Sequence, residues 1–175
     1  MNVLLIGPRG SGKSSVGVLL AGRLEIPFRD LDDLVLGSFE QTSVTEVWAT
    51  CGESAWRAAE VKSLKNSLGD EASVIALGGG VPMIKDARIL INLARDAGEA
   101  VVIYLRCEPD ELRRRLVADI GDRPGLTGED PIAEIDDVFA QRDPTYVQLA
   151  DRVFDVSTAA VEKIADDLAE WIRIV

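Results

Sequence analysis

The chain has 175 residues, of which 47% are hydrophobic and 28% charged, a composition typical of one globular domain and not of a disordered chain. Its formal net charge of −11 argues against general binding to nucleic acids or anionic membranes, because both would repel the protein at long range. Histidine is absent, which excludes Ser-His and Cys-His nucleophilic catalysis, so any proton transfer would use a carboxylate, a lysine or water.

The cysteines and the apolar segments indicate where the protein works. Cys51 and Cys107 lie far apart and lack metal-ligand spacing, so we expect free thiols in a reducing compartment. The N-terminus begins directly with a strand-like segment and shows no signal peptide. No apolar segment reaches the roughly 18 residues that a membrane helix needs. We therefore expect a cytoplasmic protein.

Before residue 70, the pattern predicts two strands and three helices. Residues 2–6 and 26–28 are short apolar segments of the kind that form buried strands. The helix between them is indicated by apolar residues at helical spacing, namely Val16, Leu19, Leu20 and Leu24. Ser43 and Glu46 have the spacing of a capping box, so a second helix should begin there. A third should begin near Glu53 and carry the apolar residues Trp56, Ala59, Leu64 and Leu68.

After residue 70, three strands and four helices are predicted. The strands are the apolar segments 73–77, 100–105 and 153–156. The first of the helices carries apolar residues at helical spacing, namely Leu90, Leu93, Ala94 and Ala97. The second should begin with Pro109, a residue favoured at the first helical position. Residues 119–131 are polar and rich in glycine and proline, which indicates a loop. Apolar residues place the last two helices near Ile132, Ile135 and Phe139 and between Val161 and Ile172.

The order of these elements predicts the fold class. Strands that alternate with helices and are almost entirely apolar are typical of a parallel sheet covered on both faces. We therefore expect an α/β fold with three layers, α/β/α, around a central five-stranded parallel sheet. The sequence shows no repeat, low-complexity tract or long linker, so residues 1–175 should form a single domain.

The first functional motif follows the first predicted strand. Residues 7–14 read GPRGSGKS and match the phosphate-binding loop (P-loop) pattern, which is a glycine, four residues and then Gly-Lys-Ser. Glycines let the backbone turn its N–H groups toward the phosphates, and the helix that follows adds its positive end. Lys13 would contact the β- and γ-phosphates, and the Ser14 hydroxyl could bind Mg²⁺. The motif therefore predicts a nucleotide site of the P-loop NTPase type.

Two carboxylates follow the second predicted strand. Asp30 and Asp32 are two residues apart, so on an extended segment they would point to opposite sides and could serve different partners. One could support a metal ion, and the other could face a hydroxylated acceptor. The alternative is a solvated turn in which Asp32 caps the next helix.

The roles of several arginines and of a run of glycines remain undecided when each motif is taken alone. Arg57 and Glu60 could form only a surface ion pair at helical spacing. Residues 78–80 are all glycine and could be a permissive turn, although the carboxyl ends of parallel strands are where α/β sheets bind ligands. Arg123 and Arg142, each followed closely by a proline, could also be surface residues.

Taken together and in this order, the motifs resemble those of the shikimate kinases. That family combines a P-loop with an F-x-D-x-D segment, a G-E-x-x-F-R-x-x-E segment, a G-G-G turn, an R-P-L-L lid and an R-x-P-x-Y segment. Here the corresponding residues begin at Gly7, Phe28, Gly52, Gly78, Arg123 and Arg142. The resemblance covers roughly residues 2 to 156. It implies ATP-dependent phosphorylation of the shikimate 3-hydroxyl, which yields shikimate 3-phosphate and ADP on the route to chorismate and the aromatic amino acids.

The resemblance also implies residue roles. Lys13, Asp32 and Arg123 would be catalytic, with Asp32 orienting or deprotonating the attacking hydroxyl. Mg²⁺ would be held by Ser14 and, through water, by Asp30. The nucleotide would be bound by Gly10, Ser11, Gly12, Lys13, Ser14, Ser15, Arg115 and Arg123. Shikimate would be bound by Asp32, Arg57, Gly78, Gly79, Gly80 and Arg142.

The remaining implications concern the surroundings of the acceptor. Glu60 would steady Arg57, and Trp48 and Trp56 would line the acceptor pocket. Residues 30–60 would form the acceptor-binding segment, and residues 119–131 would form a lid. We expect a monomer that binds ATP and shikimate, and neither nucleic acid nor membrane.

The sequence departs from the family pattern on the acceptor side and in the lid. Val35 and Leu36 stand where the family has Ile-Glu, and the lid reads Arg123-Pro124-Gly125-Leu126, one leucine short. The residues after Tyr146 also differ from the usual Glu-Val-Ala. None of these departures removes a residue with an implied role.

Three alternatives remain. The protein could be a P-loop kinase for another small hydroxy acid, such as gluconate, or a catalytically silent relative that binds nucleotide for regulation. It could also be an NTPase that acts on nucleic acid, which the acidic composition and short chain disfavour. Asp32 together with Arg57 and Arg142 favours shikimate, because the acceptor must satisfy one carboxylate and two guanidinium groups.

Overall fold

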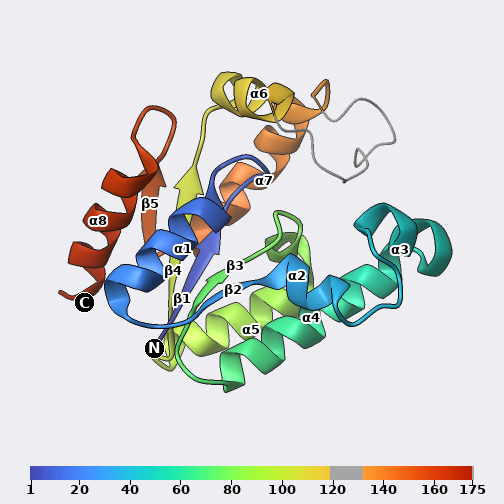
Figure 1. Cartoon of the computed structure of the whole chain (residues 1–175), viewed down its shortest axis with the longest axis horizontal. Helices are drawn as coiled ribbons and strands as arrows, with labels where there is room; N and C mark the ends of the chain where they lie inside the picture. The colour runs from blue at the N-terminus through green and yellow to red at the C-terminus, as the bar shows by residue number, and fades with distance from the viewer. Residues whose placement is uncertain (119–131, 175) are drawn as a thin grey trace.

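A computed structural model describes residues 1–118 and 132–174, and its core is one parallel sheet (Figure 1). The strand order is β2-β3-β1-β4-β5, and all four neighbouring pairs are parallel. The strands are β1 Asn2–Ile6, β2 Phe28–Asp30, β3 Val74–Ala76, β4 Ala100–Arg106 and β5 Arg152–Asp155. The predicted α/β class and the five-stranded parallel sheet are confirmed.

Helices cover both faces of this sheet (Figure 1). They are α1 Lys13–Leu24, α2 Leu31–Leu36, α3 Val44–Cys51, α4 Glu53–Gly69, α5 Lys85–Asp96, α6 Pro109–Ala118, α7 Ile135–Leu149 and α8 Val161–Ile172, with a short 3₁₀ helix η1 at Val81–Met83. Side chains alternate along β1, so that Val3 and Leu5 join the core beneath α1 and α8, whereas Leu4 and Ile6 join the core beneath α4 and α5. The two buried cores explain why the strands read as continuously apolar.

The parallel topology brings the polar motifs to one edge of the sheet. The P-loop follows β1, Asp30 ends β2 and the glycine turn at 78–80 follows β3, and these three strands are adjacent. Gly7 has φ of +148°, and a Cβ there would lie 2.6 Å from the Leu105 carbonyl oxygen of β4. A side chain at Gly7 would therefore push the phosphate loop away from the sheet.

The second strand lies two residues later than predicted, and this changes the geometry of the two aspartates. β2 pairs with β3 from Phe28 to Asp30, because Pro27 has no N–H to donate to the ladder. Asp30 therefore ends the strand, and Asp32 lies in the first turn of α2. The cap is also the reverse of the predicted one, since Asp30 Oδ1 accepts from the Asp32 backbone N–H at 3.1 Å.

The helix α5 shows the second error of the sequence analysis. Its buried residues are Ala87, Ile91 and Ala94, whereas Leu93 is 63% exposed and Ala97 is also exposed. Ala94 and the partly buried Leu90 do pack against the core as predicted, so the buried face is rotated from the predicted one toward Ala87 and Ile91. The predicted starts at Ser43, Glu53 and Pro109 are confirmed, and Ser43 Oγ accepts from Glu46 N at 3.2 Å.

Three other expectations concern the loop, the compartment and the thiols. The predicted loop at 119–131 lies outside the described residues. None of the described helices combines the length and the apolar character that crossing a membrane would require. Cys51 is exposed and Cys107 buried, and both are free thiols.

Gly17 in α1 offers a test of the close contact between this helix and β2. A Cβ at Gly17 would lie 2.4 Å from the Phe28 ring, whereas a Cβ at Gly22, on the exposed side of the same helix, meets nothing within 4 Å. We expect Gly17→Ala to lower the free energy of unfolding by about 1–3 kcal/mol through overpacking. The matched control Gly22→Ala should raise it by up to about 1 kcal/mol through helix propensity.

Urea unfolding of the parent and both variants measures this difference. If Gly17→Ala were as stable as Gly22→Ala, the Phe28 ring would not be pressed against α1.

Candidate functional site

The P-loop is a backbone cradle held closed by its own lysine. Gly10 and Gly12 have φ of +80° and +87°, conformations that favour glycine. Lys13 Nζ donates to the carbonyl oxygens of Gly7 at 3.0 Å and Pro8 at 2.8 Å. Because α1 begins at Lys13, its positive end faces the loop. The loop can therefore accept a phosphate with backbone N–H groups, a helix end and one mobile cation.

Beside the loop lies a pair of hard oxygen donors. Ser14 Oγ donates to Asp30 Oδ2 at 2.6 Å, which joins the first turn of α1 to the end of β2. Mg²⁺ is usually bound by one or two protein oxygens together with phosphate oxygens and water. Among the described residues, no group of three or more His, Cys, Asp or Glu side chains is arranged to hold a metal ion. The Ser14–Asp30 pair thus fits a magnesium ion that arrives with a nucleotide.

The glycine turn after β3 lies in contact with both sides of the site. A Cβ at Gly78 would lie 2.6 Å from Asp32 Oδ1, and a Cβ at Gly80 would lie 2.4 Å from Arg57 Nη1. A Cβ at Gly79 would lie 3.4 Å from the Gly7 carbonyl oxygen of the P-loop. The missing side chains let the P-loop, Asp32 and Arg57 converge on one turn.

Arg57 is fixed by two carboxylates of its own helix. Its Nη1 donates to Glu60 Oε2 at 2.9 Å, and its Nε and Nη2 donate to Glu53 Oε1 at 3.0 and 2.8 Å. Burial acts to lower the pKa of Arg57, but Glu60 and Glu53 outweigh it and raise the pKa. The guanidinium also lies 5.6 Å from the centre of the Trp48 ring, a cation–π distance. These contacts keep Arg57 charged and in one orientation.

Glu60 is the buried member of this pair. It is 1% exposed, and burial raises its pKa against the opposing effect of Arg57, with Asp32 adding a further upward contribution. The ion pair joins a half-buried arginine to a buried glutamate and is not the surface pair that was one alternative, and the expectation that Glu60 steadies Arg57 agrees with this geometry.

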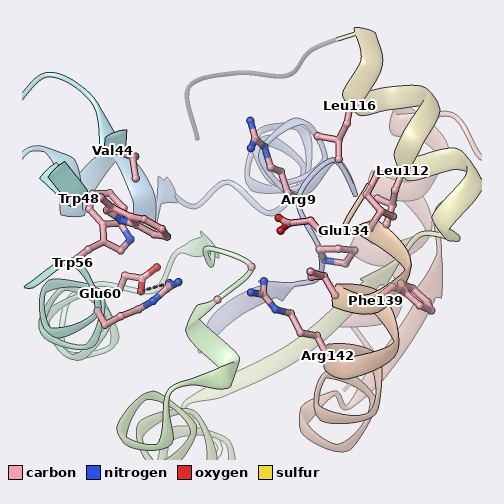
Figure 2. A pocket seen from close by; sticks show the side chains of 16 residues that line it. Arg9, Val44, Trp48, Trp56, Glu60, Leu112, Leu116, Glu134, Phe139 and Arg142 are labelled. Atoms are coloured by element: carbon pink, nitrogen blue, oxygen red, sulfur yellow. Dashed lines mark hydrogen bonds and ion pairs between the residues drawn. The ribbon is translucent and has the colours of Figure 1, made fainter. Parts of the chain in front are cut away.

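Arg142 of α7 reaches the same cavity from the opposite side. Figure 2 shows Trp48, Trp56 and Glu60 along one wall and Arg142, Glu134 and Phe139 along the other. The cavity has a volume of about 110 Å³ and is lined by both arginines, Gly79 and Gly80. Three positive or donor groups from α4, α7 and the glycine turn thus surround one small space, an arrangement suited to a small carboxylic acid.

Arg115 lies on the P-loop side, as its predicted role requires. Its Nη2 donates to the Val156 carbonyl oxygen at 2.6 Å, and its Nη1 donates to the Gly10 carbonyl oxygen at 3.4 Å. Glu111 holds the guanidinium at 2.7 Å, and hydrogen bonds from Arg114 and Arg115 lower the pKa of Glu111 to about 2. The side chain is therefore oriented beside the phosphate loop.

The structure brings together most of the residues that the sequence singled out. Ser15 is exposed in the first turn of α1, and Arg123 lies outside the described residues. The sequence analysis gave no role to Arg9 and Glu134, which also line the cavity. Arg9 occupies one of the variable positions of the P-loop pattern, and Glu134 immediately precedes α7, so neither carried a signal of its own.

A phosphate loop and an arginine-lined cavity that share one glycine turn define the class of P-loop kinases. A family model for shikimate kinase matches residues 9–173. The shikimate kinase of Thioalkalivibrio sulfidiphilus is 31% identical over 173 residues, covering 99% of this chain and 87% of the relative. The shikimate kinase of Symbiobacterium thermophilum is 37% identical over 174 residues, covering 99% and 97%. The chain therefore belongs to the shikimate kinase family, whose members are ATP-dependent phosphotransferases.

A solved structure agrees with this conclusion. Shikimate kinase from Acinetobacter baumannii in complex with shikimate matches this fold with a TM-score of 0.88 and 26% sequence identity, over 99% of this chain and 93% of that one. The predicted family and its P-loop kinase fold are confirmed.

The raised pKa of Glu60 predicts a pH dependence of stability. In the unfolded chain the Glu60 carboxyl loses its proton near the ordinary glutamate pKa of about 4.3, whereas in the folded protein it loses it at a higher pH. Between these two pKa values the free energy of unfolding therefore decreases as pH rises. Glu60→Gln removes this titration. We expect the free energy of unfolding of the variant, minus that of the parent, to increase from pH 4 to pH 7.

Urea unfolding at each pH measures the difference. A difference that falls with rising pH would mean that Arg57 lowers the pKa of Glu60 more than burial raises it.

Proposed function

We propose that this chain transfers the γ-phosphoryl group of ATP to the 3-hydroxyl of shikimate, and that the two substrates meet at the glycine turn of residues 78–80. The observation that carries the proposal is the spacing around this turn. Its missing Cβ atoms would lie 3.4 Å from the P-loop carbonyl of Gly7, 2.6 Å from Asp32 and 2.4 Å from Arg57. A phosphate donor and a carboxylic acceptor bound at these groups would be neighbours, as in-line transfer requires.

The acceptor end suits a small hydroxylated carboxylate. Arg57 and Arg142 offer two planar guanidinium groups, which bind a carboxylate with paired hydrogen bonds in a way that lysine cannot. Trp48 and Trp56 supply an apolar wall for a carbon ring. The Acinetobacter baumannii relative was solved in complex with shikimate, which supports the same acceptor here.

Asp32 is the proposed group that orients or deprotonates the attacking hydroxyl. It lies in the first turn of α2 beside Gly78, at the same sheet edge as the P-loop. The chain has no histidine, so a carboxylate is the natural acceptor for this proton. Phosphoryl transfer depends mainly on alignment and charge neutralisation, so a weak base in the correct position is sufficient.

The donor end would combine the P-loop with three side chains. Lys13 would turn from the carbonyls of Gly7 and Pro8 to the β- and γ-phosphates, and Arg115 would contact the nucleotide from α6. Ser14 and Asp30 would hold Mg²⁺, the latter through water. When bound, the metal supplies positive charge that offsets the charge developing on the phosphate oxygens. Arg123, in the proposed lid at 119–131, would complete the neutralisation.

The acceptor is tested by a panel of hydroxy acids in a coupled assay for ADP release. We expect rapid turnover with shikimate and little with gluconate, because only a ring acid of this size satisfies both arginines and Asp32 together. Turnover of gluconate without turnover of shikimate would overturn the proposal. ATP binding without turnover of any acid would indicate a silent relative.

The role of Arg142 predicts a selective loss of acceptor affinity. In Arg142→Ala, charged hydrogen bonds to the substrate carboxylate are lost in both the ground state and the transition state, so KM for shikimate should rise roughly 10- to 100-fold with a smaller change in kcat. KM for ATP should change little. Lys163→Ala is the matched control, because it also removes one positive charge but lies 69% exposed on α8.

Steady-state kinetics with each substrate varied in turn provide the measurement. An unchanged KM for shikimate in Arg142→Ala would remove Arg142 from the acceptor site.

A further inference from the structure

Tyr146 is a buried polar residue to which the proposed mechanism gives no role. Its side chain is 1% exposed, and its hydroxyl donates to the Gly79 carbonyl oxygen at 2.6 Å, across 67 positions of sequence. A buried phenol needs such a partner, since leaving the hydroxyl unpaired would cost free energy. The contact fastens α7 to the glycine turn at its central residue.

The same hydroxyl is close to Arg142. The two residues are four positions apart on α7 and so lie on the same helix face. Burial raises the pKa of Tyr146 to about 12, whereas the positive charge of Arg142 acts to lower it. The helix face that carries Arg142 is therefore the face that the Tyr146 hydroxyl fastens to Gly79.

The position of α7 itself has a separate anchor. Asp143 Oδ1 accepts from the Tyr104 hydroxyl at 2.8 Å and from Arg106 Nε at 2.9 Å, and both donors belong to β4. The rings of Tyr104 and Tyr146 also pack with centroids 5.0 Å apart. The helix would therefore remain on the sheet if only the Tyr146 hydroxyl were removed. The effect of that hydroxyl can be separated from the stability of the fold.

We propose that Tyr146 is a positioning residue, which sets Arg142 of α7 and the Gly79–Gly80 backbone at the spacing that the acceptor carboxylate requires. The inference rests on the proposed function, because it assigns Tyr146 to the acceptor side of that site. Tyr146 acts through these two groups and does not contact the reacting atoms. Its loss should therefore affect shikimate binding and leave the phosphate loop unaffected.

The first test is Tyr146→Phe, which keeps the ring and removes the hydroxyl. We expect KM for shikimate to rise about ten-fold, with kcat and KM for ATP changed less than two-fold. Tyr104→Phe is the matched control: it removes the neighbouring buried hydroxyl, but its partner Asp143 retains Arg106. This control should lower stability to a similar extent while leaving KM for shikimate near that of the parent.

A double-mutant cycle tests whether Tyr146 works through Arg142. If it does, Arg142→Ala/Tyr146→Phe should have nearly the same KM for shikimate as Arg142→Ala alone, because the arginine to be positioned is already absent. Multiplicative increases in KM would overturn the inference. So would an equal rise of KM in Tyr104→Phe and Tyr146→Phe, since that result would indicate a general loss of structure.

If Tyr146→Phe does not fold, a measurement on the parent sequence still tests the inference. Tyr104 and Tyr146 are the only tyrosines, so 3-fluorotyrosine labelling gives two fluorine NMR signals, which Tyr104→Phe assigns. Shikimate should shift the Tyr146 signal more than the Tyr104 signal, and an unmoved Tyr146 signal would overturn the inference. If the parent phosphorylates shikimate and Arg142→Ala raises KM, an unmoved Tyr146 signal rejects only the positioning role of Tyr146. If the parent does not use shikimate, the proposed function fails as well.

Discussion

The turn that follows β3 has no side chains from Gly78 to Gly80. Asp32 and Arg57 occupy the space that side chains at Gly78 and Gly80 would need, and the P-loop backbone contacts Gly79. Asp32 lies 2.6 Å from one missing Cβ, Arg57 lies 2.4 Å from another, and the P-loop backbone lies 3.4 Å from the third. Any larger residue at the outer two positions would separate groups that must converge. The whole site therefore depends on close approach to bare backbone, which only glycine permits.

The second constraint is electrostatic, because an acidic protein must bind two anions. The net charge is −11, yet the cavity walls carry Arg9, Arg57 and Arg142. Glu60, buried behind Arg57, holds that guanidinium in place and raises its pKa together with Glu53. Cations that line a confined cavity act on a ligand over a few ångströms. The field of the exposed surface charges, by contrast, is screened by salt over about 8–10 Å at ordinary ionic strength. The overall charge thus limits nonspecific partners without preventing anion binding.

The sequence predicted the sheet well, because buried parallel strands are continuously apolar and end at glycine or polar residues. It failed at the start of β2, where Pro27 cannot donate to the ladder, and at α5, where packing buries Ala87 and Ile91 and leaves Leu93 exposed. The family motifs identified the polar and aromatic residues Trp48, Trp56, Arg57, Glu60 and Arg142 of the cavity, but not its aliphatic lining, such as Leu112 and Val138. The link from Tyr146 to Gly79 spans 67 positions and depends on how α7 packs, so no local pattern could indicate it.

The chemistry explains why such a site can be assembled from separate segments. Phosphoryl transfer requires the reacting groups to be aligned and their charge neutralised, and it needs little covalent assistance from the protein. The groups proposed to do this come from the ends of β1, β2 and β3, from α4, α6 and α7, and from the proposed lid. Their relative positions therefore depend on contacts between elements. The polar links Ser14–Asp30 and Tyr146–Gly79 join these elements in pairs, and Glu60 orients Arg57 within α4. Each link is worth only about 1–3 kcal/mol, but a displacement of about 1 Å in one group can slow an aligned reaction about 100-fold. These links therefore matter more for the geometry of transfer than for the stability of the fold.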